Sequence, residues 1–187
     1  MNIVIQFLNS IHPMSTPLLE HLDTVLKLRT LHKREYLLRA GHICRNISFI
    51  QQGLLRCFYI KGDMEVCSWF MKEGDVIISV ESFYGQKTSY ESIQALEECE
   101  LYYIDYNELQ QIYKLFPDFN FIGRVLTERY YMLSEQRLYS LRMQRAQERF
   151  DYFIEHYPEL LLRIPAKYIA SYIGITEVTM SKIRARM

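Results

Sequence analysis

Basic and hydroxyl side chains concentrate at the C-terminal end of this sequence, where they could bind the phosphates and base edges of a nucleic acid. From residue 163 onward there are five basic side chains and one acidic side chain, a local net charge of +4. The whole chain has 22 basic and 22 acidic residues and is therefore neutral. A positive patch on a neutral protein is typical of a surface that binds phosphate groups.

The spacing of apolar residues predicts that two short helices carry this patch. Pro165 suits the start of the first helix, and Gly174 suits the left-handed residue that ends it. Thr176 then suits the N-cap of the second helix. The predicted apolar faces comprise Ile169, Ala170, Ile173, Val178, Met180 and Ile183. Two helices joined by a glycine turn indicate a helix-turn-helix, although a helical pair that merely packs on the preceding domain would share this pattern.

In a helix-turn-helix, the second helix lies in the major groove of DNA and its side chains divide into two groups. We expect base-edge contacts from Glu177, Thr179, Ser181 and Lys182. We expect phosphate contacts from Lys167, Thr176, Arg184 and Arg186.

The sequence shows no pattern of a catalytic or metal site. The four cysteines form no CxxC pair and have no histidine at ligand spacing, so buried, reduced thiols are expected rather than a metal or iron–sulfur site. The strands lack the clustered histidines and glutamates of a cupin, and no nucleophile–base pair is evident, so we do not expect an enzyme. The cysteines are Cys44, Cys57, Cys67 and Cys99.

The preceding residues predict an α+β architecture. Residues 1 to about 30 have helical periodicity, with a cap and first turn at Ser15, Thr16 and Pro17. Short β-like segments follow, at residues 47–51, 54–60, 65–71, 76–80, 90–96 and 100–104. A hairpin turn is predicted at residues 61–63, and many short strands at this spacing favour a jelly roll.

A helix from Asn107 to about Phe116 leads to a long helix over residues 119–141, and another helix covers residues 144–156. The long helix repeats apolar residues at intervals of 3, 4 and 7, as in a heptad seam. The predicted seam comprises Phe119, Ile122, Leu126 and Leu133, with Val125 and Met132 alongside. We expect the seam to form a homodimer, and the alternative is a helix that packs only on its own β-domain.

This order of elements, together with several motifs, resembles the Crp/Fnr family of bacterial transcription regulators. The motifs lie at residues 53–56, 61–65, 73–75 and 95–101 of the β-domain and at residues 164–165, 169–170, 173–176 and 181–184 of the helix-turn-helix. The resemblance implies a cyclic-nucleotide-binding-like β-roll (a double-stranded β-helix) over residues 1–117, a dimerisation helix over 118–142 and a DNA-binding domain over 143–187. It also implies a homodimer on a palindromic promoter site in double-stranded DNA, with RNA polymerase as a further partner.

The expected cyclic AMP site departs from the family pattern. Family members hold the cyclic phosphate with an arginine, but no arginine lies between Arg56 and Arg124, and Lys87 is a flexible substitute. We therefore expect no cofactor and no useful affinity for cyclic AMP. The β-roll holds another small-molecule effector or none, and its tyrosines line a ligand site or fill the core. The candidate pocket residues are Ser79, Glu81, Tyr84, Ser89, Tyr90 and Glu91.

The recognition helix departs as well, because many relatives have glutamate at the position of Val178 and arginine at that of Lys182. The DNA half-site is therefore expected to differ from the usual one. With no apolar run of 18 residues and no secretory signal, a cytoplasmic protein is expected, without membrane contact. The alternative function is a small-molecule-binding or protein-interaction module with a vestigial helix-turn-helix.

Overall fold

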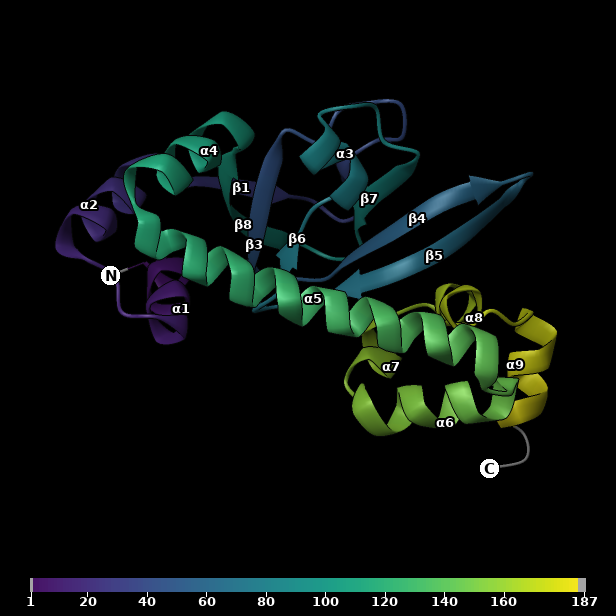
Figure 1. Ribbon diagram of the computed structural model, residues 1–187. Helices are drawn as coiled ribbons and strands as arrows, with labels where there is room; N and C mark the ends of the chain where they lie inside the picture. The colour runs from purple at the N-terminus through teal and green to yellow at the C-terminus, as the bar shows by residue number, and fades with distance from the viewer. Residues whose placement is uncertain (1, 185–187) are drawn as a thin grey trace.

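The computed structural model describes residues 2–184, in which a two-sheet β-domain is joined by one long helix to a cluster of short helices (Figure 1). Helices α1 (Ile3–Ile11) and α2 (Thr16–Val25) precede the strands, and Asn2 caps α1 by accepting a 2.8 Å hydrogen bond from the Val4 amide. Within the described residues, no helix is both long enough and apolar enough to cross a membrane.

Two antiparallel four-stranded sheets form the β-domain, in the orders β1-β8-β3-β6 and β2-β7-β4-β5. This strand order is that of an eight-stranded jelly roll, so the predicted α+β class and β-roll are confirmed. The strands are β1 (Lys27–Leu31), β2 (Tyr36–Leu38), β3 (Asn46–Gln52), β4 (Leu55–Lys61), β5 (Met64–Met71), β6 (Val76–Ile77), β7 (Glu91–Ala95) and β8 (Cys99–Asp105).

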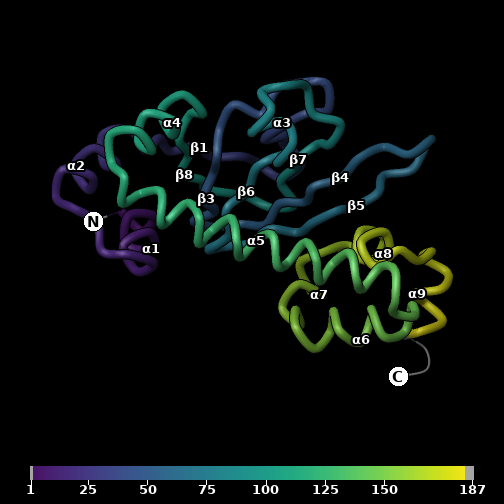
Figure 2. The backbone as a smooth tube through the Cα atoms, in the orientation of Figure 1, coloured from purple at the N-terminus to yellow at the C-terminus, as the bar shows by residue number. Residues whose placement is uncertain are grey.

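The β4–β5 hairpin extends from the roll toward the C-terminal helices (Figure 2). Its turn lies where the sequence predicts one, and Gly62 has the positive φ (60°) that such a turn favours. The remaining helices are α3 (Val80–Gly85), α4 (Tyr106–Leu115), α5 (Pro117–Met143), α6 (Ala146–His156), α7 (Leu160–Arg163), α8 (Ala166–Ile173) and α9 (Glu177–Arg184).

Two local predictions are wrong. Residues 27–30 belong to β1 rather than to a helix, because β1 pairs with β8 along its length, from Lys27 opposite Tyr103 to Leu31 opposite Cys99. The strand predicted over residues 76–80 ends at Ile77, and α3 begins at Val80. In both places a distant partner or a following helix overrides the local pattern.

The predicted heptad seam of α5 is also wrong in part. Phe119 and Ile122 are buried in the core of the β-domain, and Leu126 packs against that core half-buried. Helices α1 and α4 pack against α5 there, so burying these side chains removes them from water without a second chain. They therefore cannot form an outward-facing seam.

A second core joins the C-terminal helices to the β-domain. It contains residues of α6, α8 and α9 together with Leu54 and Leu96, which lie at the edge of the roll. All four cysteines are buried and free, as expected, and burial raises the pKa of the Cys99 thiol to about 11. Among the described residues, no three histidine, cysteine or acidic side chains gather as they would around a metal ion.

Candidate nucleic-acid interface and sensor pocket

Helices α8 and α9 are joined by the turn that the sequence predicts. Gly174 ends α8 with φ of 77°, and the Ile175 amide donates to the Ala170 carbonyl at 3.0 Å, which closes the last turn. The Thr176 hydroxyl accepts a 3.1 Å hydrogen bond from the Thr179 amide, so Thr176 caps α9. Local capping therefore positions the second helix.

Helix α9 has one buried face and one exposed face. Met180 and Ile183 are buried in the second core with Ile169, Ala170 and Ile173 of α8. Lys167 and Thr176 are exposed, while Thr179 is half-buried and its hydroxyl lies 2.9 Å from that of Thr176. The exposed residues of α9 include Glu177, Val178, Ser181 and Lys182. Arg186 and the side chain of Arg184 lie outside the described residues.

Arg163 does not contribute to the positive patch, although the local net charge of +4 includes it. Its guanidinium donates to the Glu73 carboxylate at 2.8 and 3.0 Å and also pairs with Glu97, and these contacts raise its pKa. The partners lie 90 and 66 residues away in sequence, so no local signal could have revealed them. Arg163 instead ties α7 to the β-domain.

Further contacts bind α8 to the β4–β5 hairpin. The Ser171 hydroxyl accepts from the Cys67 amide at 3.0 Å and donates to the Glu65 carbonyl at 2.9 Å, which extends the hydrogen bonding of β5. Arg56, only 2% exposed, stacks between the rings of Phe58 and Tyr168 at 4.0 and 3.8 Å. Helix α8 is thus docked on the β-domain through polar and stacked contacts.

Three of the six predicted pocket residues gather inside the β-roll. The Ser79 and Ser89 hydroxyls lie 2.9 Å apart, and the Ser89 hydroxyl also bonds the backbone of Glu91. Burial raises the pKa of the Glu91 carboxyl, which lies within 3.5 Å of the Ser68 hydroxyl. In this cluster the serine hydroxyls and their acceptors form hydrogen bonds with one another. No cationic side chain takes part in these hydrogen bonds.

The other three predicted pocket residues point elsewhere. Glu81 pairs with Lys87, so the lysine that could replace the missing arginine has a partner. Tyr84 packs on Phe83, and Tyr90 packs on Tyr59 at a ring distance of 6.4 Å, both with exposed side chains. None of the six residues belongs to the described lining of two cavities elsewhere in the molecule, of about 520 and 210 Å³.

The β-domain matches a known family. Residues 28–115 match the family model of the cyclic nucleotide-binding domain. A comparison with curated proteins finds no significant match for the chain.

Solved structures extend the likeness beyond the cyclic nucleotide-binding domain. FixK2 from Bradyrhizobium japonicum is 16% identical over 87% of this chain and 84% of its own, with a TM-score of 0.74. The c-di-GMP-responsive global regulator CLP of Xanthomonas campestris is 17% identical over 92% of this chain and 91% of its own (TM-score 0.71). A CooA mutant from Carboxydothermus hydrogenoformans is 18% identical over 92% and 85% (TM-score 0.70). The resemblance to Crp/Fnr regulators is therefore confirmed for the fold.

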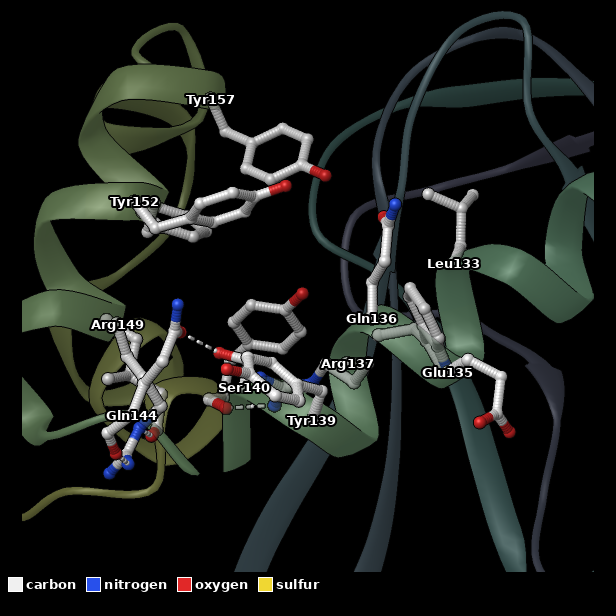
Figure 3. Close-up of a pocket in the computed structure, with 14 residues that line it drawn as sticks. Leu133, Glu135, Gln136, Arg137, Tyr139, Ser140, Gln144, Arg149, Tyr152 and Tyr157 are labelled. Carbon is white, nitrogen blue, oxygen red and sulfur yellow. Dashed lines mark hydrogen bonds between the residues drawn. The ribbon is translucent and has the colours of Figure 1, made fainter. Parts of the chain in front are cut away.

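The larger cavity lies between the β-domain and the C-terminal helices, and no sequence pattern predicts it. It is lined by residues of β5, α5, α6 and α8 and by Gln144 (Figure 3). One signal was present: Arg137 lies four residues after Leu133, on the α5 face that carries Phe119 and Ile122. An arginine on an inward face of a helix indicates that polar or charged partners surround it. The sequence does not reveal these partners, because they come from other elements.

Proposed function

We propose that this chain is a sequence-specific, DNA-binding transcription regulator of Crp/Fnr type that acts as a homodimer. One observation carries the proposal: Met180 and Ile183 anchor α9, while Glu177, Ser181 and Lys182 face solvent on the opposite side. Helix α9 also lies at the end of the molecule farthest from α1 and α2, where a duplex could reach it (Figure 1). The fold likeness to known regulators supports this role.

In the proposed complex, α9 lies in the major groove. Lys182 donates to acceptors on a guanine edge, and Glu177 accepts from a cytosine amino group. Val178, 65% exposed, has no polar atom and would contact a thymine methyl group. Lys167 and Thr176 would hold phosphates, together with Arg184 and Arg186.

The homodimer would form through a largely exposed apolar stripe on α5, which we call the α5 stripe. It comprises the exposed residues Phe121, Met132, Tyr139 and Met143 and the half-buried Val125. The spacing of 4, 7, 7 and 4 residues keeps these side chains within one narrow face of a helix. Met132 and Tyr139 are 59% and 62% exposed, and this face points away from the core that holds Phe119 and Ile122. A second copy of α5 is the occupant that matches such a stripe.

DNA binding is tested by fluorescence anisotropy with the DNA upstream of the protein's own gene, over a series of salt concentrations. We expect Lys182→Ala to weaken specific binding by about tenfold or more, because it removes a base-edge contact. Lys114→Ala, at the far end of α4, removes the same charge and should leave binding unchanged. A DNA affinity that depends on neither the DNA sequence nor the salt concentration would favour the alternative, an interaction module with a vestigial helix-turn-helix.

The sensor pocket is proposed to be degenerate toward cyclic AMP. A buried cyclic phosphate needs a fixed cation, whereas the Ser79–Ser89 cluster holds Glu91 and Lys87 is paired with Glu81. We expect calorimetric titration with cyclic AMP to give no heat of binding at micromolar concentrations. Micromolar or tighter binding would contradict this part of the proposal and leave the DNA-binding part intact.

The remaining parts of the proposal follow from the family type. A homodimer with two copies of α9 would read a palindromic promoter site, and RNA polymerase would be the partner through which transcription changes. No catalytic role is proposed, and the protein would act in the cytoplasm, where its DNA lies.

A further inference from the structure

The cavity between the two cores has the size and position of a ligand site. Its volume is about 520 Å³, within the usual range for small-molecule pockets. Trp69 comes from β5 of the β-domain, Arg137 from α5, Tyr152 and Tyr157 from α6, and Tyr172 from α8. Tyr139, a member of the α5 stripe, also lines the cavity. The cavity therefore lies at the junction of the two parts of the molecule, away from the Ser79–Ser89 cluster of the β-roll.

Aromatic rings form much of the cavity wall. Tyr152 and Tyr157 lie on one side, with Leu133 and Gln136 opposite (Figure 3). Burial raises the pKa of the Tyr157 hydroxyl to about 12, so this group stays neutral and can donate a hydrogen bond. A wall of flat rings with a few hydroxyl groups suits a flat, partly apolar ligand.

Two arginines bring positive charge to this aromatic wall. The Arg137 guanidinium stacks 3.6 Å from the centre of the Tyr172 ring and donates one hydrogen bond to the Tyr172 carbonyl. The Arg149 Nε donates to the Ile173 carbonyl at 2.7 Å, and its Nη1 donates to the Gln144 carbonyl at 2.5 Å. Each guanidinium has five N–H donors, so both keep donors beyond these bonds to neutral carbonyls.

The charge of these two arginines is not balanced by an acidic partner. Within residues 2–184, no carboxylate lies at ion-pair distance from Arg137 or Arg149. Glu135 is the one acidic residue of the described lining, and its carboxylate points away from the cavity (Figure 3). Burial lowers the pKa of Arg137, which indicates that its charge is poorly solvated. Both arginines are half-buried, and charges withdrawn from water are normally paired, so the two guanidinium groups point to an anionic ligand.

We propose that this cavity binds a small organic anion that carries an aromatic ring. The ring packs against Tyr152, Tyr157 and Trp69, and the anionic group accepts hydrogen bonds from Arg137 and Arg149. A carboxylate and a phosphate share this chemistry, and the experiment below separates them. Binding stands independently of the proposed DNA-binding function; only its consequence, a change in how α8 and α9 are held against β5, rests on that function.

Trp69 is the single tryptophan of the chain and lines the cavity, so its fluorescence reports on occupancy. The probe is the aromatic sulfonate 1-anilinonaphthalene-8-sulfonate, which accepts energy from tryptophan, titrated into the full chain. Phenyl phosphate, phenylacetate and neutral 2-phenylethanol then compete for the site. We expect one dye per chain and displacement by at least one of the two anions at about tenfold lower concentration than by the alcohol. Whichever anion displaces the dye better identifies the anionic group.

Three variants sharpen this test. Arg137→Gln should weaken dye binding about tenfold or more, because it removes a charged donor. Gln136→Trp places a large ring in the cavity from an exposed position and should block binding while both arginines remain. Arg142→Gln, an exposed arginine of α5 outside the cavity lining, is the matched control and should bind as the unaltered chain does. Thermal unfolding shows whether each variant is folded.

Several results would overturn the proposal. One is equal displacement by the alcohol and the anions, and another is unchanged binding in folded Gln136→Trp. Dye binding that occurs only in a monomeric Met132→Glu variant would show that a second copy of the chain fills the cavity. None of these measurements uses DNA, so a failure here is distinct from a failure of the proposed DNA-binding function.

Discussion

Replacing Met132 by glutamate is expected to convert a dimer into a monomer and to weaken DNA binding by about a hundredfold or more. Met132 lies at the middle of the α5 stripe and is 59% exposed in the single chain. Two carboxylates would face each other across the α5 helices, and each would have to lose its water. A monomer presents one α9 instead of two, so the gain from simultaneous engagement of both half-sites is lost.

Light scattering after size-exclusion chromatography measures the mass, and fluorescence anisotropy measures DNA affinity. Ser134→Glu is the control, because it adds the same charge to an exposed position of α5 outside the α5 stripe. It should remain dimeric and bind DNA normally. A dimeric Met132→Glu protein would show that the α5 stripe is not the interface, and a monomeric one with unchanged affinity would remove the link between dimerisation and DNA binding.

Replacing Gly53 by alanine is expected to lower the free energy of unfolding by roughly 3 kcal/mol or more. Gly53 has φ of 103°, a backbone conformation that costs a residue with a side chain 1–2 kcal/mol, roughly. An added Cβ would also lie 2.5 Å from the Cys99 Sγ and 2.6 Å from the Glu98 carbonyl oxygen. These neighbours belong to the turn into β8 and to β8 itself, so they cannot move without disturbing the strand.

Thermal and urea unfolding measure this change, which corresponds to a fall in the melting temperature of about 10 °C for a chain of this size. Gly41→Ala is the matched control, since Gly41 also has positive φ (85°) but has no atom within 4 Å of an added Cβ. It should lose only the backbone cost, about 1 kcal/mol. Equal losses in the two variants would show that the close approach of Gly53 to β8 does not contribute.

Features that depend on neighbouring residues were predictable from the sequence. The turn at Gly174, the cap at Thr176 and the hairpin around Gly62 all follow from backbone preferences within a few residues. The β-strands of the roll were also predicted, except for the short β1 and β2. The apolar periodicity of α8 and α9 likewise placed Ile169, Met180 and Ile183 in a core.

Features that depend on distant partners were not predictable. The local net charge of +4 includes Arg163, but the carboxylates of Glu73 and Glu97 pair with this residue from the β-domain. The repeat of apolar residues along α5 is evident in the sequence. Only the packing shows that Phe119 and Ile122 face the β-domain core while Met132 faces outward. A helix with apolar residues on two faces gives no local indication of which face the domain covers.

By itself, therefore, the sequence determined the order of elements, the turn between α8 and α9, and the absence of any arginine between Arg56 and Arg124. Local backbone energetics and residue identity decide these features. The tertiary structure alone decided how α8 docks on the β4–β5 hairpin, which face of α5 is free and where Arg137 and Arg149 meet the tyrosines of α6 and α8. These features arise from residues tens of positions apart, and their contacts exist only after the chain has buried its two cores.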